Sequence, residues 1–176
     1  MAKVFIGVGS NIAPEVNIRT AIRLLARRAR IVAVSTFYRT EAEGAPGPPF
    51  INGVVEVDTD IRPDALKRDV LRPIEEVLGR KRTADKYAPR KIDLDILAYG
   101  SLALMTDDVV IPDPQIEKRA FLAVPLSEIA PDLTLPGVGK PMRDVAKAYA
   151  GHTMKSLPDF TASLKRDAQD SGREPK

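Results

Sequence analysis

Two aspartates in the middle of the chain are spaced for metal chemistry. Acidic and apolar residues alternate through the segment IDLDIL at residues 92–97. Successive side chains of a β-strand point to opposite faces, so Asp93 and Asp95 would share one face, roughly 7 Å apart. Two carboxylates this close repel each other unless a cation lies between them. Mg²⁺ binds through one or two carboxylates plus substrate phosphates, so the pair predicts a magnesium–phosphate site.

A run of basic residues directly before the aspartates supports this interpretation. Six of the twelve residues at positions 80–91 are lysine or arginine. Such side chains bind the phosphate charge that a metal leaves unneutralised. Each feature alone is more often a solvated strand face or a solvated loop. Their adjacency, with residues of buried type on either side of the acids, favours a metal–polyphosphate site.

Length and composition predict one domain. The chain has 176 residues, a net charge of +3 and no cysteine, which is long enough for a substantial core. We expect a single domain over residues 1–160 and a disordered tail over residues 161–176, since almost nothing apolar follows Leu164. The lack of cysteine excludes disulfides and thiol catalysis and fits the cytoplasm. No apolar run is long enough to span a membrane.

Hydrophobic periodicity predicts the element order βαββαβ. Strands are expected over residues 3–8, 31–38, 50–58 and 92–99, and helices over residues 16–30 and 63–78. Pro73 should kink or break the second helix, and residues 7–11 should form a tight turn after the first strand. Further on, prolines should limit helices around residues 125–136. This order is typical of an α+β ferredoxin-like sandwich, with a mainly antiparallel sheet and both helices on one face.

An aromatic ring and a carboxamide lie side by side at the start of the third expected strand. Phe50 and Asn52 share a strand face next to a loop rich in Gly and Pro. A carboxamide both donates and accepts hydrogen bonds, so it suits the edge of a heterocycle on whose face the ring stacks. If these two residues are taken alone, the commoner explanation is that the phenylalanine is part of the core and the asparagine forms hydrogen bonds in a turn.

Taken together, the segments resemble the 6-hydroxymethyl-7,8-dihydropterin pyrophosphokinases of folate biosynthesis. The resemblance covers about residues 4–136, and its most specific part is the Asp-Leu-Asp-Ile sequence that closely follows Pro89-Arg90. It implies the ferredoxin-like fold. It also implies transfer of a diphosphate from ATP to the hydroxymethyl group of the pterin, with release of AMP.

The resemblance also implies a role for each part of the site. Asp93 and Asp95 match the aspartates that bind two Mg²⁺ ions. The residues implied to contact the pterin are Thr40, Gly44, Phe50, Asn52 and Phe121. The residues implied to contact ATP are Glu75, Arg82, Lys86, Tyr87, Arg90, Ile96 and Arg119. The residues implied to act in catalysis are Arg80, Arg82 and Arg90, together with the two aspartates.

Some positions depart from the family pattern. Lys86-Tyr87-Ala88 stands where the family commonly has Arg-Trp-Gly, and a lysine loses the bidentate fork of an arginine. Asp113 stands where a histidine is common. These departures affect the nucleotide side, whereas the residues implied for the metal and the pterin are intact.

Two other classes of function stay open at this point. Nucleotidyltransferases also use Gly-Ser with Asp-x-Asp, but there the motifs lie close together, whereas Ser10 and Asp93 are far apart in this sequence. Ferredoxin-like sheets also bind RNA through exposed aromatic residues on the central strands, and Phe5 and Tyr99 are poor candidates. We therefore expect a monomer that binds ATP and the pterin, and neither nucleic acid nor membrane.

Overall fold

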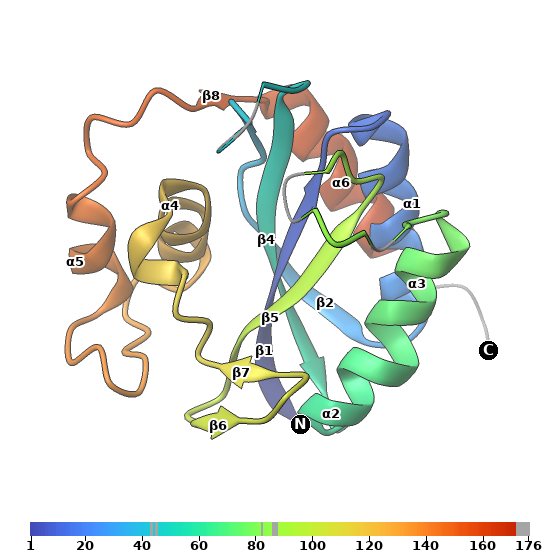
Figure 1. Ribbon diagram of the computed structural model, residues 1–176. Coiled ribbons are helices and arrows are strands. Elements are labelled where there is room, and N and C mark those ends of the chain that lie inside the picture. The colour runs from blue at the N-terminus through green and yellow to red at the C-terminus, as the bar shows by residue number, and fades with distance from the viewer. Residues whose placement is uncertain (43, 45, 82, 86–87, 172–176) are drawn as a thin grey trace.

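A twisted antiparallel sheet forms the centre of the molecule (Figure 1). The computed structural model describes residues 1–42, 44, 46–81, 83–85 and 88–171. The sheet has the strand order β5-β1-β4-β3-β8, and β2 also pairs with β4. Its strands are β1 (Ala2–Ser10), β2 (Arg30–Val34), β3 (Tyr38–Thr40), β4 (Phe50–Thr59), β5 (Asp93–Tyr99) and β8 (Lys155–Ser156). A separate hairpin consists of β6 (Leu104–Met105) and β7 (Val110–Ile111).

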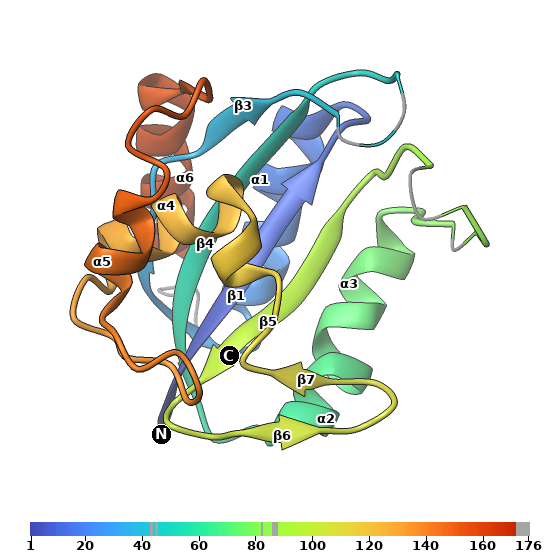
Figure 2. The ribbon, with the colours of Figure 1, turned by 60° about the vertical axis from the view of Figure 1, so that its left-hand side comes forward.

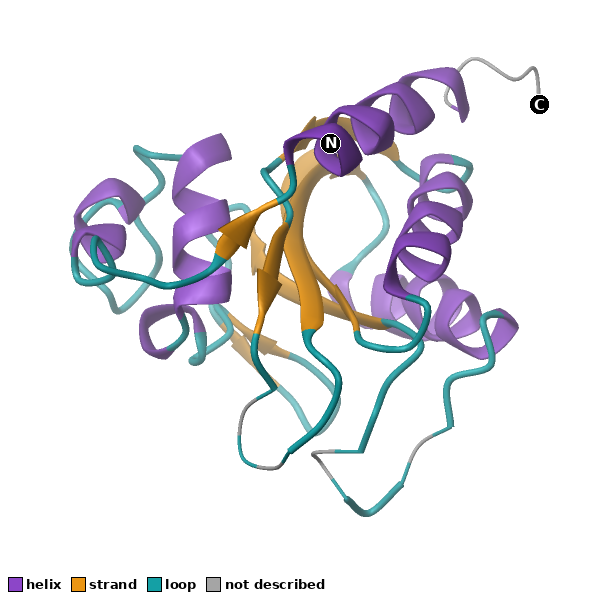
Figure 3. Ribbon diagram, turned by 90° about the horizontal axis from the view of Figure 1, so that it is seen from above, coloured by secondary structure: helices purple, strands orange, loops and turns teal. Residues whose placement is uncertain are grey.

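Helices cover both faces of this sheet (Figures 1 and 3). On one face lie α1 (Pro14–Ala26), α6 (Pro158–Ser171) and a longer helix made of α2 (Pro63–Ala65), a π-helical segment (Leu66–Leu71) and α3 (Arg72–Val77). On the other face lie α4 (Ala120–Ile129) and α5 (Met142–Lys147), preceded by a 3₁₀ turn (Ile116–Lys118). In the part of the chain that the structure describes, no helix is both long and apolar enough to cross a bilayer.

The central strands supply side chains to two hydrophobic cores. Val4 and Ile6 of β1 pack with Ile18 of α1 on one face. Phe5, which lies between them in the strand, packs with Leu126 of α4 on the other. The alternation follows from the period of two residues in a strand. The sheet is therefore the middle of three layers.

The predicted ferredoxin-like order is confirmed. The elements β1, α1, β2 with β3, β4, the helix at 63–77 and β5 follow one another as expected. Two short strands replace the single strand expected over residues 31–38. The tight turn expected over residues 7–11 is wrong, because β1 continues to Ser10 and pairs with β4 and β5 along its length.

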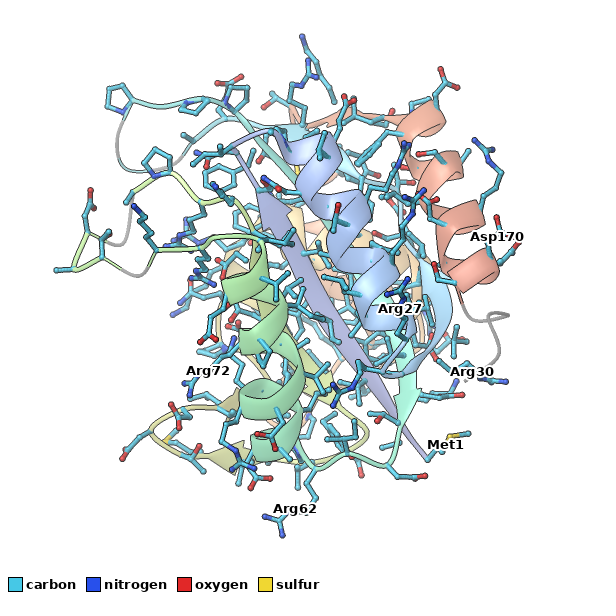
Figure 4. The ribbon with its side chains drawn as sticks, turned by 90° about the vertical axis from the view of Figure 1, so that its right-hand side faces the viewer. Met1, Arg27, Arg30, Arg62, Arg72 and Asp170 are labelled. Atoms are coloured by element: carbon cyan, nitrogen blue, oxygen red, sulfur yellow. The ribbon has the colours of Figure 1, made fainter. Side chains whose placement is uncertain are left out.

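Pro73 is accommodated by a wider helical turn rather than by a break. Proline has no N–H group, and its ring presses against the carbonyl group four residues earlier. In the turn before it, the N–H group of Arg72 bonds to the carbonyl oxygen of Lys67, five residues back. Figure 4 shows the helix as one continuous rod, with Arg62 at its lower end and Arg72 further along. Buried Leu66, Leu71 and their neighbours hold it against the sheet.

The disordered tail expected over residues 161–176 is wrong for residues 161–171, which belong to α6. Thr161, Leu164 and Ala168 recur on one face of this helix and are buried. Asp167 forms ion pairs with Arg19 and Arg23 of α1. Part of the arginine-rich face of α1 therefore contacts α6. A few apolar residues are enough to bury one side of α6. Residues 172–176 lie outside the described residues.

A second correction concerns α4, which forms where prolines were expected to limit helices. Pro125 lies inside α4 and is buried. Pro125 is the sixth of the ten residues of α4, so the helix lacks one N–H donor there and continues to Ile129. The helix places Phe121, in its first turn, toward the cavity described below.

Candidate active site

A cavity of about 330 Å³ opens on the face of the sheet that carries α4. Its floor is formed by β1 and β5, and its walls by the start of β4, the start of α4 and the segment after β7. Most of the residues predicted for the site line it, namely Thr40, Phe50, Asn52, Arg90, Asp93, Asp95, Arg119 and Phe121. These residues come from four separate parts of the chain, which the antiparallel sheet brings together.

Other predicted residues lie elsewhere. Glu75 and Arg80 lie behind the cavity, where they contact the strand that carries the aspartates. Ile96 is buried and borders a second cavity. Gly44 is exposed and does not line either cavity. Arg82, Lys86 and Tyr87 lie outside the described residues.

The two aspartates lie side by side on β5. Asp93 pairs in register with Gly9 of β1, and Asp95 pairs with Gly7. Both side chains line the cavity, as the period of a strand predicts. Figure 2 shows β5 beside β1, with α4 over the neighbouring β4. Gly7 and Gly9, opposite the two aspartates, add no side chain to the part of the floor that β1 forms.

Asp93 contacts two arginines through its two oxygens. Arg80 Nη1 donates to Oδ1 at 2.7 Å, and Arg90 Nη1 donates to Oδ2 at 2.5 Å. Arg80 is itself held by the buried carboxylate of Glu75, which also accepts from the N–H group of Leu94. Burial raises the pKa of Asp93, and the neighbouring Asp95 adds to this effect, while the arginines oppose it.

Asp95 contacts a lysine that the sequence did not single out. Lys67 Nζ donates to Asp95 Oδ1 at 2.8 Å and to the carbonyl oxygen of Leu94 at 2.7 Å. Burial by itself would raise the pKa of Asp95, but the ammonium group of Lys67, together with Arg80 and a hydrogen bond with Asp93, holds that pKa below its usual value. Half of the Asp95 side chain remains exposed toward the cavity, whereas that of Lys67 is only 12% exposed.

The other end of the cavity is shaped for a flat ring. Phe50, Asn52 and Phe121 all line the cavity. Asn52 Nδ2 donates to Thr40 Oγ1 at 2.9 Å, which fixes the orientation of the carboxamide. A Cβ atom on Gly9 would lie 2.4 Å from Asn52 Oδ1. Gly9 therefore allows the side chain of Asn52 to lie close to β1, and it does not mark a turn. The sequence analysis interpreted the glycine run as a turn and missed this alternative.

The donor set at the acid pair fits a hard cation that is only partly bound by protein. Within the described ranges no group of three or more His, Cys, Asp or Glu side chains is arranged to hold a metal ion. Asp93 and Asp95 supply carboxylate oxygens only. Mg²⁺ keeps several water ligands and is bound through one or two carboxylates plus substrate phosphates, so the pair fits Mg²⁺ that arrives with a phosphorylated ligand.

A second cavity, of about 250 Å³, adjoins the first at Asp95. It lies between the π-helical segment, β5 and the hairpin of β6 and β7. Its lining includes Lys67, Ile96, Val109 and Pro114. Asp113 borders both cavities, and its Oδ1 accepts from the N–H group of Gln115 at 2.8 Å. Burial raises the pKa of Asp113, and the nearby Asp95 and Asp93 add to this effect.

Comparison with known proteins gives one consistent family. The model of the 7,8-dihydro-6-hydroxymethylpterin-pyrophosphokinase (HPPK) family matches residues 5–131. A relative from Synechocystis sp., named 2-amino-4-hydroxy-6-hydroxymethyldihydropteridine pyrophosphokinase, is 41% identical over 77% of this chain and 70% of its own length. A relative of the same name from Pseudomonas aeruginosa is 36% identical over 89% of this chain and 97% of its own length.

Solved structures share the fold. The crystal structure titled HPPK-DHPS in complex with substrates superposes with a TM-score of 0.67 at 14% identity, over 85% of this chain and 44% of that one. A Plasmodium falciparum HPPK-DHPS structure gives a TM-score of 0.70 at 13% identity, over 94% of this chain and 47% of that one. This chain thus spans less than half the length of those structures. At such identities the likeness concerns the fold alone.

Proposed function

The chain belongs to the 7,8-dihydro-6-hydroxymethylpterin-pyrophosphokinase family, and we propose that it transfers a diphosphate from ATP to the hydroxymethyl group of 6-hydroxymethyl-7,8-dihydropterin, using the cavity around Asp93 and Asp95. The observation that carries this proposal is that an acid pair suited to magnesium and a ring-lined end with an oriented carboxamide share one cavity. A metal–phosphate reaction on a flat heterocycle needs both parts within reach of each other.

The ring-lined end would bind the pterin. A flat ring between Phe50 and Phe121 gains apolar burial on both faces. Asn52 and Thr40, already bonded to each other, would bind the polar edge of the heterocycle. The hydroxymethyl group would then point toward the acid pair. Gly44 is proposed to act only through the loop that carries it, because it does not line the cavity.

The phosphates of ATP would lie over the acid pair, beside Arg90 and Arg119, which line the same cavity. We place the adenosine in the second cavity, because it adjoins the first at Asp95 and is lined by Ile96. Glu75 does not line either cavity. Its contacts with Arg80 and with the N–H group of Leu94 indicate that it acts by holding Arg80 and β5 in place.

Asp93 and Asp95 would hold the two Mg²⁺ ions, which when bound supply charge neutralisation and alignment of the phosphates. Arg80, fixed by Glu75, keeps Asp93 oriented in their absence. We propose a monomer as the working unit.

The reaction would be an in-line displacement at the β-phosphorus of ATP. The hydroxymethyl oxygen forms the new bond to this phosphorus and loses its proton, and the bond from the β-phosphorus to the oxygen shared with the α-phosphorus breaks, so AMP leaves. Such transfers depend on positioning and charge stabilisation more than on covalent help. Phe50, Phe121 and Asn52 would orient the alcohol, and Arg90 and Arg119 would stabilise the charge on the phosphate oxygens.

The test is a product assay with ATP, Mg²⁺ and the hydroxymethyl pterin. We expect one AMP for each pterin diphosphate, and we expect Asp95→Ala to lower turnover by about 10³-fold or more because a ligand of the metal is lost. Circular dichroism should show an unchanged fold. Asp64→Ala is the matched control, since Asp64 is paired with Arg62 on the surface away from the cavity.

Three results would contradict the proposal. Release of pyrophosphate instead of AMP would indicate a nucleotidyltransferase. Salt-sensitive RNA binding without turnover of ATP would indicate an RNA-binding module. Near-normal activity of Asp95→Ala would remove this residue from the mechanism.

A further inference from the structure

Each of the two aspartates is tied to a buried cation that is anchored to the protein frame. Arg80, whose side chain is 16% exposed, joins Asp93 to Glu75. Lys67, whose side chain is 12% exposed, joins Asp95 to the carbonyl oxygen of Leu94. Arg80 belongs to the basic run that precedes the acids, but Lys67 comes from a helix on the opposite face of the sheet.

The π-helical segment is what carries Lys67 to this place. Lys67 is its second residue, and its carbonyl oxygen accepts the widened hydrogen bond from Arg72 that Pro73 imposes. An additional residue in one turn rotates the residues before it by about 100° relative to a regular helix. π-helical turns inside α-helices occur frequently at functional sites. Here the turn sets a charged side chain at the junction of the two cavities.

We propose that Lys67 is a positioning residue that balances the charge of Asp95 in the free protein and thereby makes metal binding at the acid pair depend on the nucleotide; this inference rests on the proposed function. Lys67 occupies Oδ1 of Asp95, so a cation in the cavity binds that carboxylate through Oδ2. The second bond of Lys67, to Leu94, keeps its ammonium group fixed.

The positive groups in direct contact with the two aspartates explain why metal binding would depend on the nucleotide. Lys67, Arg80 and Arg90 all touch the acid pair. A bare divalent ion therefore meets positive groups close by, and repulsion between charges a few ångströms apart is substantial in a partly buried site. The phosphates of a nucleotide bring the missing negative charge. Removal of the charge of Lys67 leaves Asp95 uncompensated and attracts a divalent ion without a nucleotide.

The test is a titration of the full chain with Mn²⁺, followed by the electron paramagnetic resonance signal of the free ion. Without nucleotide we expect Lys67→Met to bind Mn²⁺ at least about tenfold more tightly than the wild type, because a neighbouring positive charge is gone. Lys67→Arg should keep the weak binding of the wild type. Arg68→Met is the matched control, since Arg68 belongs to the same segment but pairs with the surface residue Asp69.

A gain of affinity separates this role from a merely structural one, because damage to the fold lowers affinity. Lys67→Gln, which keeps a donor for Leu94, should show the same gain and serves as the second variant if Lys67→Met does not fold. Folded Lys67→Met or Lys67→Gln protein that binds Mn²⁺ no more tightly than the wild type would overturn the inference.

A parallel titration with a non-hydrolysable ATP analogue distinguishes the two proposals. The wild type should bind Mn²⁺ much more tightly with the analogue than without it, and this ratio should shrink in Lys67→Met. If the wild type responds to the analogue but Lys67→Met shows no gain without it, only the role of Lys67 fails. If no variant binds Mn²⁺ with the analogue and no AMP forms, the proposed function fails.

Discussion

Phe50 reaches the cavity from the start of β4, and Phe121 reaches it from the first turn of α4. Neither ring is fully buried in the free protein. A ligand that covers them removes apolar surface from water, and the energy of this burial is confined to the ring-lined end of the cavity. In the arrangement that we propose, the nucleotide lies over the acid pair and in the second cavity, so its binding does not depend on this burial.

This separation predicts the effect of Phe50→Ala. Loss of one stacking face should weaken the binding of the pterin by about ten- to a hundredfold, as expected for about 1.5–3 kcal/mol of apolar burial. The dissociation constant of an ATP analogue should change by less than about twofold. Calorimetric titration of each ligand measures both. Phe50→Leu keeps most of the apolar area and should lose less, and equal losses for the two ligands would contradict the assignment of the ring-lined end.

At the residue scale, strand periodicity explains what the sequence could predict. The shared faces of Asp93 with Asp95 and of Phe50 with Asn52 follow from a local rule that holds in any strand. Lys67 could not be predicted in this way. Its contact with Asp95 depends on a helical turn widened by Pro73 and on how the helix packs across β5. The meeting of the ring-lined end with the acid pair likewise depends on pairing between distant strands.

Among the elements, β3 and the residues just before it are tied to α4 by hydrogen bonds to Glu128. The hydroxyl group of Tyr38 donates to the carboxylate of Glu128, and the second oxygen of Glu128 accepts from the N–H group of Thr36 at 2.8 Å. Burial, and then Glu128, raise the pKa of Tyr38 to about 12. The protonated hydroxyl is therefore part of what holds the edge of the sheet against the α4 layer.

This contact predicts a loss of stability in alkali. In the unfolded chain a tyrosine ionises near pH 10. Between about pH 10 and about pH 12 the folded state retains a proton that the unfolded state has lost, so the free energy of unfolding falls as pH rises. Tyr38→Phe should be less stable near neutrality but should lose about 2 kcal/mol less than the wild type across this range. Urea unfolding at several pH values measures this.

Tyr149→Phe is the control for that experiment, because its hydroxyl group donates to a backbone carbonyl, that of Glu117, rather than to a carboxylate. A wild type and a Tyr38→Phe variant that lose stability in parallel would show that the contact with Glu128 does not hold in solution.

The elements also show where sequence patterns fail for physical reasons. The glycines of β1 suggested a turn, but a strand flanked by partners on both sides retains glycines when a side chain would collide with its neighbours, as at Gly9. The prolines near α4 suggested a broken segment, yet α4 continues through Pro125, its sixth residue, with the loss of one N–H donor. The rules that glycines mark turns and that prolines break helices take no account of the tertiary contacts that override them.

At the scale of the whole molecule, the three layers separate stability from chemistry. The larger core lies between the sheet and the layer of α1, α6 and the helix at residues 63–77. The cavity lined by the acid pair, where we propose that the reaction occurs, opens on the other face, beside α4. Figure 3 shows these layers on either side of the strands. The sheet contributes to both sides and holds the acid pair in a fixed geometry, while none of the described residues of α6 lines the cavity.

α6 therefore provides a test of the layer arrangement. Leu164 is fully buried in the larger core, and Leu164→Ala should lower the free energy of unfolding by about 2–4 kcal/mol through lost burial and a residual cavity. Turnover per folded molecule should stay within about twofold of the wild type, because the change lies across the sheet from the cavity.

Asp170→Ala is the control, since Asp170 is exposed near the end of the same helix and should change stability by less than about 0.5 kcal/mol. Urea unfolding and steady-state kinetics measure the two effects separately. A Leu164→Ala variant of unchanged stability would show that residues 158–171 do not pack on α1 in solution, and a stable variant with low turnover would show that the two faces of the sheet are coupled.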